Sequence, residues 1–369
     1  MDLDKKICSR CIMNETIEDL LLDQDGICQY CKIQDQQEEG YPVDEEKIIK
    51  ICERIKIDGK NKKYDCVAGT SGGADSTYVL YIAKKYGLNP LVVHLDNGWN
   101  SEIAVQNIKN SLVKLKLDLK THVIDWDEFK DIQLSFLKAS VSDGEIPTDI
   151  AIRALLYNTA NQFNVKYIIT GSNFRTEGGS PQSWTYMDGK YIESVQKSFG
   201  SMKIKTFPNI SFYKQFYFNI IKKINVLKIL NYVPYNKNNV KELLNKELGW
   251  VDYGGKHYES IYTKFYQSYI LYNKFNIDKR LTEYSALIRS GQIERDKALE
   301  IINNPPYDKD EVEFDKLYIL KKLMISEKDF EKIMSSPIKT FKDYKTHYHL
   351  KEKYSWLYKK YKKIIKNKY

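Results

Sequence analysis

The sequence predicts an α/β fold: a doubly wound parallel sheet with a small N-terminal cysteine knuckle and a helical C-terminal region. Three observations predict it. Short apolar runs alternate with longer amphipathic segments between residues 64 and 170, which is typical of strands and helices that build a parallel sheet. A Gly-Gly turn follows the first apolar run, and two Cys-x-x-Cys pairs precede it. We therefore expect the knuckle at 1–40, the sheet domain at 41–255 and the helical region at 256–369.

The individual elements follow from hydrophobic periodicity. Helices are expected at 44–58, 74–86, 101–117 and 149–163, and strands at 64–69, 91–96, 121–124 and 167–170. Gly87 is expected just beyond the second helix, Ser101 at the start of the third, and Thr148 with Asp149 as the cap of the fourth. The region 172–260 is less regular, and the chain beyond it is again helical.

Composition and charge exclude several classes of protein. The 369 residues are 42% hydrophobic and 29% charged, as in a folded globular chain. No apolar run approaches the roughly 18 residues of a membrane-spanning helix, and the first residues do not resemble a secretory signal. We therefore expect a cytoplasmic protein without membrane insertion. The net charge of +9 is concentrated in residues 345–369, where nine Lys and one acidic residue, Glu352, give +8.

Four of the six cysteines form two Cys-x-x-Cys pairs. They are Cys8, Cys11, Cys28 and Cys31. The sixteen residues between the pairs fall within the usual spacing of a two-knuckle zinc site. Four thiolates leave no open coordination position, so the predicted Zn²⁺ is structural; an iron–sulfur cluster or a redox pair is the alternative. The other thiols, Cys52 and Cys66, lie on an apolar helix face and in an apolar strand, and both are expected in the core.

A glycine-rich turn follows the first expected strand. It reads Gly69-Thr70-Ser71-Gly72-Gly73-Ala74-Asp75-Ser76 and continues directly into a helix. Paired glycines let the backbone approach an anion, and successive N–H groups at the helix N-terminus then cradle a phosphate. The turn lacks the lysine of a Walker A loop. It resembles the Ser-Gly-Gly-x-Asp-Ser loop (PP-loop) of ATP pyrophosphatases of the adenine nucleotide α-hydrolase fold, which implies that ATP binds there and yields AMP and pyrophosphate.

The chain also resembles the N-acetyl sugar amidotransferase family, in segments that lie in order between about residues 7 and 300. The segments are 8–13, 26–31, 71–76, 94–101, 146–149, 170–178, 254–260, 290–292 and 295–296. One departure is Ala74, where family members often carry Lys. Because a lysine there could contact phosphate, its absence draws attention to Arg175 and Lys256 as phosphate partners.

This resemblance implies a reaction and its partners. Such enzymes use ATP and Mg²⁺ to convert the acetamido group of a nucleotide-linked N-acetyl sugar to an acetamidino group, for bacterial surface polysaccharides or glycans. Ammonia comes from a separate glutaminase and is conducted by a cyclase-like subunit, so both are expected partners. Neither Cys52 nor Cys66 has a glutaminase-like setting, which agrees with an external source. The sequence specifies neither the sugar nor the oligomeric state.

Candidate site residues come from this resemblance and from the strand ends, where parallel sheets bind ligands. The candidates for ATP binding are Thr70, Ser71, Gly72, Gly73, Asp75, Ser76, Asp96, Gly171 and Asn173. The candidates for the sugar are Trp99, Thr148, Arg175, Trp184, Lys256 and His257. The candidate catalytic residues are Asp75, Ser76, Glu177 and His257. Plainer interpretations stay open: Asp96 as a turn residue, Glu177 as a solvated loop carboxylate and Trp184 as packing.

Two other functions remain as alternatives. A tRNA-modifying enzyme of the thiolase type also combines this loop with Cys-x-x-Cys knuckles, and the basic run at 359–363 would then contact phosphates. It would need Cys52 or Cys66 beside ATP, so nucleic acid is not the expected partner. A knuckle adaptor that only senses ATP is the third hypothesis, and the intact loop argues against it.

Overall fold

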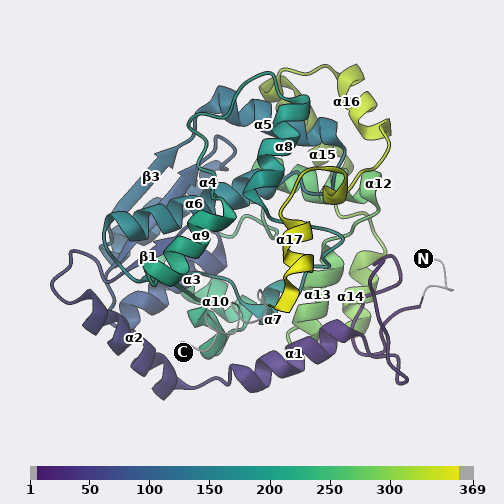
Figure 1. Ribbon diagram of the computed structural model, residues 1–369. Coiled ribbons are helices and arrows are strands. Elements are labelled where there is room, and N and C mark those ends of the chain that lie inside the picture. The colour runs from purple at the N-terminus through teal and green to yellow at the C-terminus, as the bar shows by residue number, and fades with distance from the viewer. Residues whose placement is uncertain (1–5, 357–369) are drawn as a thin grey trace.

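A computed structural model describes residues 6–356, and its centre is a five-stranded parallel sheet (Figure 1). The strands are β1 (Cys66–Gly69), β2 (Pro90–Asp96), β3 (Leu119–Val123), β4 (Tyr167–Ile169) and β5 (Asn225–Leu227). Their spatial order is β3-β2-β1-β4-β5, and every neighbouring pair is parallel. The chain runs outward from β1 to β3 and returns to β4 on the other side of β1. The strand order therefore reverses between β1 and β4, and the predicted doubly wound sheet is confirmed.

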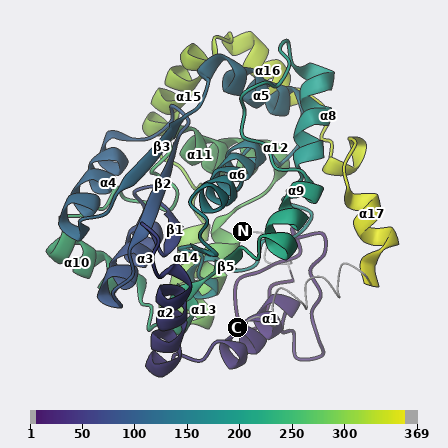
Figure 2. The same cartoon turned by 60° about the vertical axis from the view of Figure 1, so that its left-hand side comes forward.

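Helices cover both faces of the sheet (Figure 2). One layer contains α2 (Glu45–Gly59), α3 (Ala74–Lys85), α4 (Glu102–Leu115) and α10 (Lys237–Leu248). The other contains α5 (Trp126–Ala139), α6 (Ile146–Gln162) and α8 (Gly189–Phe199). Side chains alternate between the layers: Ala68 and Val92 belong to the core beneath the first, and Val67 and Leu91 to the core beneath the second. Burial on both faces explains why the central strands β1 and β4 carry no polar side chain.

The remaining helices surround the sheet domain, and residues 261–356 are mostly helical, as predicted. They are α1 (Gln29–Gly40), α7 (Phe174–Glu177), α9 (Phe212–Phe216), α11 (Ile261–Phe265), α12 (Leu271–Phe275), α13 (Arg280–Arg289), α14 (Arg295–Ile302), α15 (Lys309–Leu323), α16 (Glu327–Ser335) and α17 (Tyr348–Lys353). Two π-helical segments, η1 (Tyr217–Ile221) and η3 (Tyr266–Ile270), and two 3₁₀ segments, η2 (Ile229–Tyr232) and η4 (Phe341–Asp343), complete the set. None of the helices within residues 6–356 has the length and apolarity that crossing a membrane requires.

The helix boundaries confirm some predicted signals and correct one. Ser101 caps α4, since its Oγ accepts a hydrogen bond from the N–H of Ala104, and Gly87 follows α3 with a φ of +74°. The predicted cap at Thr148 and Asp149 is wrong. Helix α6 begins at Ile146, so both residues lie within its first turn. The basic run 359–363 lies outside the described residues, and the domain boundaries stay predictions.

Candidate active site

A large cavity opens where the strands end. It has a volume of about 1460 Å³ and is lined from the carboxyl ends of β1, β2 and β4, the first turn of α6, α7, the segment 252–260 and α13. Doubly wound sheets bind their ligands at this edge, beside the reversal of strand order. Pockets for one drug-sized ligand usually measure about 300–1,000 Å³, so this cavity has room for two substrates.

The glycine-rich turn forms one wall of the cavity. It leaves β1 after Gly69, and α3 begins with Gly73 in the N-cap position. Gly72 has a φ of +82°, and a Cβ at this position would lie only 2.3 Å from the carbonyl oxygen of Ala104. Glycine is therefore required both by the left-handed backbone and by the close approach of α4. Gly72 shapes the turn without lining the cavity itself.

Hydrogen bonds fix the polar groups of this turn. The backbone N–H of Ser71 donates to Ser76 Oγ at 3.2 Å, and the two hydroxyl oxygens lie 3.3 Å apart. The hydroxyl of Tyr235 donates to the carboxylate of Asp75. Thr70, Ser71, Asp75 and Ser76 all line the cavity. The turn thus presents two hydroxyl groups beside the N-terminus of α3, where the helix dipole favours a phosphate.

An ion pair from the segment 252–260 faces the turn. His257 Nδ1 lies 3.8 Å from Glu259 Oε1, and the same oxygen lies 3.5 Å from Ser71 Oγ. The Tyr253 hydroxyl donates to the other carboxylate oxygen at 3.1 Å. Burial alone would lower the pKa of His257, but Glu259 outweighs it and the pKa is raised. Burial alone would raise the pKa of Glu259, but His257 and Tyr253 hold it below its usual value.

Other carboxylates also line the cavity, and two of them differ from Glu259 in having raised pKa values. Glu145 and Asp149 stand at the start of α6, and Glu177 ends α7. Burial raises the pKa of Glu145 and of Glu177, because the surrounding protein displaces the bulk water that would solvate the charged form. Gln267 donates to Glu145 at 2.6 Å. Asp149 and Glu177 accept no side-chain hydrogen bond within the described part of the chain, although Asp149 is open to the cavity.

Two lysines face these carboxylates. Lys256 Nζ donates to the backbone oxygen of Thr176 at 3.3 Å. Lys279 Nζ donates to Ser180 Oγ at 3.3 Å and lies 5.8 Å from the centre of the Trp184 ring. Neither ammonium group has a carboxylate within ion-pair distance among residues 6–356, and burial lowers the pKa of Lys279. Both lysines are therefore available to an anionic group in the cavity.

The cavity brings together most of the predicted site residues. Those that line it are Thr70, Ser71, Gly73, Asp75, Ser76, Thr148, Gly171, Glu177, Trp184, Lys256 and His257. Their individual roles stay predictions. Three further residues that line the cavity, Glu145, Tyr253 and Lys279, were not predicted. Only Tyr253 carried a usable signal, because it precedes the Gly-Gly pair at 254–255 within the segment that faces the turn.

The prediction that Trp99 binds the sugar is wrong, because this residue belongs to the core. Its side chain is 1% exposed, and its indole N–H donates to Gln133 Oε1 at 2.8 Å. Its ring packs against Trp126 and Tyr262, with ring centres 5.3 Å away in each case. A buried aromatic ring with a satisfied N–H has no surface left for a sugar.

Arg175 and the predicted ATP ligand Asn173 do not line the cavity. Arg175 is buried and pairs with Glu38 of α1, so it is not free for phosphate. Asn173 is fully buried and caps α7, since its Oδ1 accepts a hydrogen bond from the backbone N–H of Arg175 at 3.0 Å. Asp96 Oδ1 accepts from the N–H of Gly98 at 3.0 Å, which agrees with its interpretation as a turn residue. The assignments of Arg175 and Asn173 to this cavity are therefore wrong, and that of Asp96 stays a prediction.

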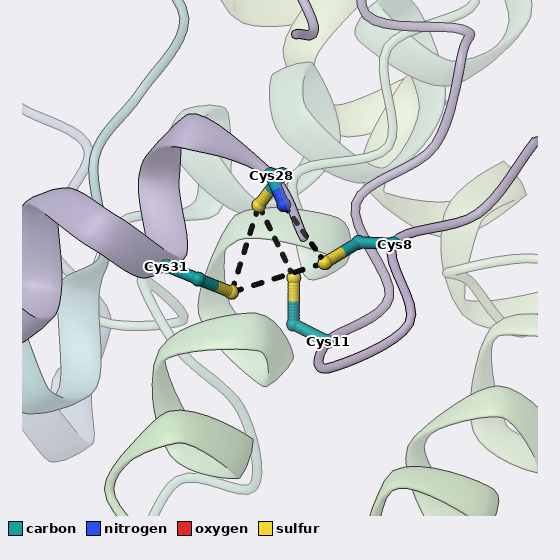
Figure 3. A group of neighbouring side chains, drawn as sticks. All are labelled: Cys8, Cys11, Cys28 and Cys31. Atoms are coloured by element: carbon teal, nitrogen blue, oxygen red, sulfur yellow. Dashed lines mark hydrogen bonds between the residues drawn. The ribbon is translucent and has the colours of Figure 1, made fainter. Parts of the chain in front are cut away.

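The four knuckle cysteines meet in one buried cluster (Figure 3). Cys8 and Cys11 come from an N-terminal loop, and Cys28 and Cys31 from the start of α1. Neighbouring sulfur atoms are 3.6 to 3.9 Å apart, and all ligand atoms lie within 4.8 Å of one another. A tetrahedral ion with metal–sulfur bonds of about 2.3 Å needs sulfurs about 3.8 Å apart. The cluster could therefore hold a single metal ion.

Comparisons with known proteins point to one family for the C-terminal region. Residues 259–362 match the family model described as LPS biosynthesis protein WbpG-like, C-terminal domain. The uncharacterized protein MJ1599 of Methanocaldococcus jannaschii is 33% identical over 138 residues, which are 36% of this chain. The match spans only about half of that relative, 47% of its length.

Two solved structures give weaker likenesses. NMN synthetase from Francisella tularensis is 16% identical with a TM-score of 0.32, covering 76% of this chain and 96% of that one. NH3-dependent NAD synthetase from Campylobacter jejuni is 24% identical with a TM-score of 0.27, covering 36% of this chain and 58% of that one. At such TM-scores the likeness carries no conclusion about function.

Proposed function

We propose, on the premise that residues 259–362 form a WbpG-like C-terminal domain, that this protein is an ATP-dependent, AMP-forming N-acetyl sugar amidotransferase of bacterial surface polysaccharide synthesis. The observation that carries the proposal is the glycine-rich turn at 70–76, which faces a cavity of about 1460 Å³. ATP on the turn and a nucleotide-linked sugar beside Lys256 and His257 would share this cavity, as a direct reaction between them requires. The enzyme would act in the cytoplasm, where both substrates are found.

The proposed reaction needs positioning more than covalent catalysis. The amide oxygen of the acetamido group attacks the α-phosphorus of ATP, pyrophosphate leaves, and an adenylated imidate forms. Ammonia then adds to the imidate carbon and loses a proton, and AMP departs to leave the acetamidine. Ser71, Ser76 and the N–H groups of the turn would hold the leaving phosphates. Glu177 would accept the proton, because its raised pKa makes this carboxylate a stronger base than usual.

Mg²⁺ would accompany ATP in this reaction. Carboxylate oxygens are its preferred protein ligands, and Asp75 and Glu259 supply them at the turn. Glu259 Oε1 lies 3.5 Å from Ser71 Oγ, where a carboxylate would repel a bare polyphosphate. A divalent cation between the two would make the interaction favourable, which supports these two residues as its ligands.

The cysteine cluster would hold a structural Zn²⁺. Its four thiolates fill a tetrahedral coordination sphere, and all four cysteines are buried, so no position remains for substrate. A segment of about 40 residues buries little apolar core, and a bound metal would supply the missing stability.

Ammonia would come from a partner glutaminase through a cyclase-like subunit. None of the six cysteines, all of them within the described range, lines the cavity. Burial raises the pKa of Cys52 to about 11 and also raises that of Cys66, so neither thiol is an activated nucleophile. The same two observations weigh against the tRNA thiolase alternative, which needs a reactive cysteine beside ATP.

The test is an assay with Mg²⁺-ATP, ammonium chloride and a panel of nucleotide-linked N-acetylated amino sugars, in which AMP and the mass of the sugar are followed together. The expected result is AMP formed in step with a sugar one mass unit lighter, because NH replaces O. ATP that stays intact with every sugar, but yields AMP when bulk tRNA is added, would overturn the proposal in favour of tRNA modification.

A further inference from the structure

Helix α7 is anchored on the side that faces away from the cavity. The Arg175 side chain is 8% exposed, and its guanidinium grips Glu38 of α1: Nε donates to Oε1 at 3.0 Å, and a second N–H donates to Oε2. Two further N–H groups donate to the backbone oxygens of Asn231, at 2.9 Å, and Tyr41, at 3.2 Å. The planar donor fork of arginine matches this arrangement, which a lysine would not.

Helix α1 is in turn part of the cysteine module. It begins at Gln29, directly after Cys28, and its Gln34 accepts a hydrogen bond from Arg289 Nε at 2.6 Å. A second N–H of Arg289 points at Cys11 Sγ at 3.8 Å. The contact fixes the C-terminal end of α13 against both the cysteine cluster and α1.

Helix α13 contacts both α7 and the cysteine loops. Ser290 lies just beyond its last residue, and its Oγ is 2.9 Å from the backbone oxygens of both Arg175 and Ala286, which share its single O–H donor. Within α13, the hydroxyl oxygen of Ser285 accepts a hydrogen bond from the backbone N–H of Ile12 at 3.3 Å. Arg295, the first residue of α14, donates to the backbone oxygens of Cys8 and Cys11. Helices α1 and α13 therefore hold α7 directly, and both are tied to the cysteine loops.

These anchors matter because α7 does not hold itself in place. It has four residues, far fewer than the roughly 12 that an isolated helix needs to be even marginally stable. Its last residue, Glu177, faces the cavity and accepts no side-chain hydrogen bond within the described part of the chain. The position of the Glu177 carboxylate is consequently set by the backbone of α7, and the backbone is set by the anchors.

We propose that the cysteine loops and α1 form a brace that positions Glu177 in the cavity through the Glu38–Arg175 ion pair. Arg175 is then a positioning residue, which accounts for a buried arginine next to the cavity that does not reach it. Only the consequence for turnover rests on the proposed function. That Glu38 holds α7 in place follows from the contacts, whatever reaction the protein catalyses.

The test compares Glu38→Gln with Glu39→Gln in the full-length, metal-loaded protein. Glu39 is the matched control, since it is an exposed acidic residue on the same helix and has no ion pair within the described residues. Backbone hydrogen exchange is followed by mass spectrometry. Residues 174–177 are expected to exchange about tenfold faster in Glu38→Gln only, which corresponds to about 1.4 kcal/mol and is reasonable for losing a charged hydrogen bond at a partly exposed pair.

A second variant, Arg175→Lys, tests the same ion pair if Glu38→Gln folds poorly. Arg175→Lys keeps the charge and loses the fork, so it should give a smaller acceleration at the same residues. Exchange at 174–177 equal to that of Glu39→Gln would overturn the brace, as would an acceleration spread evenly over all helices. In turnover assays kcat should fall about tenfold while the Kd for ATP stays within twofold, because the ATP turn lies on other elements. Absence of AMP from every protein, wild type included, would refute the proposed function and leave the exchange result standing.

Discussion

Replacing Gly72 by alanine should weaken ATP binding and slow catalysis about 10²-fold while leaving the protein folded. Gly72 has a φ of +82°, and an added Cβ would lie 2.3 Å from the oxygen, 2.9 Å from the carbon and 3.0 Å from the Cα of Ala104. All three are backbone atoms in the first turn of α4, so no side chain can rotate to relieve the contact. The glycine-rich turn must move instead.

The size of the effect follows from these distances. Left-handed backbone costs a non-glycine residue about 1–2 kcal/mol, and forcing an extra carbon into packed backbone costs about 1–3 kcal/mol. A total near 2–5 kcal/mol is below the stability of most domains, about 5–15 kcal/mol, so the fold should survive. Relieving a 2.3 Å contact to an ordinary separation displaces the turn by about 1 Å, and such a misplacement typically costs about 10²-fold in catalysis.

Gly291→Ala provides the matched control. Gly291 also has a left-handed backbone, with a φ of +67°, but an added Cβ there meets nothing within 4 Å. It should lose about 1–2 kcal/mol of unfolding free energy and bind ATP normally. Isothermal titration with ATP and urea unfolding measure both quantities. ATP affinity of Gly72→Ala within twofold of the Gly291→Ala value would refute the assignment of this turn to phosphate binding.

Three further predictions concern the metal cluster and the carboxylates. Cys11→Ser should lose the bound metal ion and Cys52→Ser should keep it, as measured by elemental analysis of the purified proteins. Glu177→Gln should lower kcat about 10²–10⁴-fold and remove the acidic limb of its pH profile, which in the wild type lies above the ordinary carboxyl range because burial raises the Glu177 pKa. Burial also raises the pKa of Asp143 to about 7, so its folded form binds a proton more tightly and stability is lost as the pH rises through 7. Asp143→Asn should therefore narrow the difference in unfolding free energy between pH 5 and pH 8 by about 3 kcal/mol, measured by urea titration.

The parallel sheet was predictable because its central strands are buried on both faces. Buried runs such as Tyr167–Ile169 are apolar at every position, and the turns beside them carry glycine. β5 is three residues long and contains the buried polar residue Asn225, so no periodicity marks it. α5 was missed although Phe129, Ile132 and Phe136 recur at helical spacing.

In the site, too, only features that depend on neighbouring residues in the sequence could be predicted. The glycine-rich turn could be predicted, because its chemistry is local and lies within eight consecutive residues. The direction of a side chain near the sheet edge depends on partners far away in the sequence. Arg175 turns toward Glu38, 137 residues earlier, and Trp99 toward Gln133, 34 residues later. No local pattern distinguishes such residues from those that face the cavity.

Two carboxylates of the cavity, Glu259 and Glu177, have pKa values that their environments shift in opposite directions. Glu259 is held ionised by His257 and Tyr253 beside the phosphate turn, where a permanent negative charge suits a cation. Glu177 has a raised pKa and no competing side-chain hydrogen bond within the described residues, which suits a group that exchanges protons. The proposed reaction needs one function of each kind, a cation at the polyphosphate and a base for the incoming ammonia. If Glu259→Gln weakened ATP binding while Glu177→Gln left it unchanged and slowed only amidine formation, this division of roles would account for both.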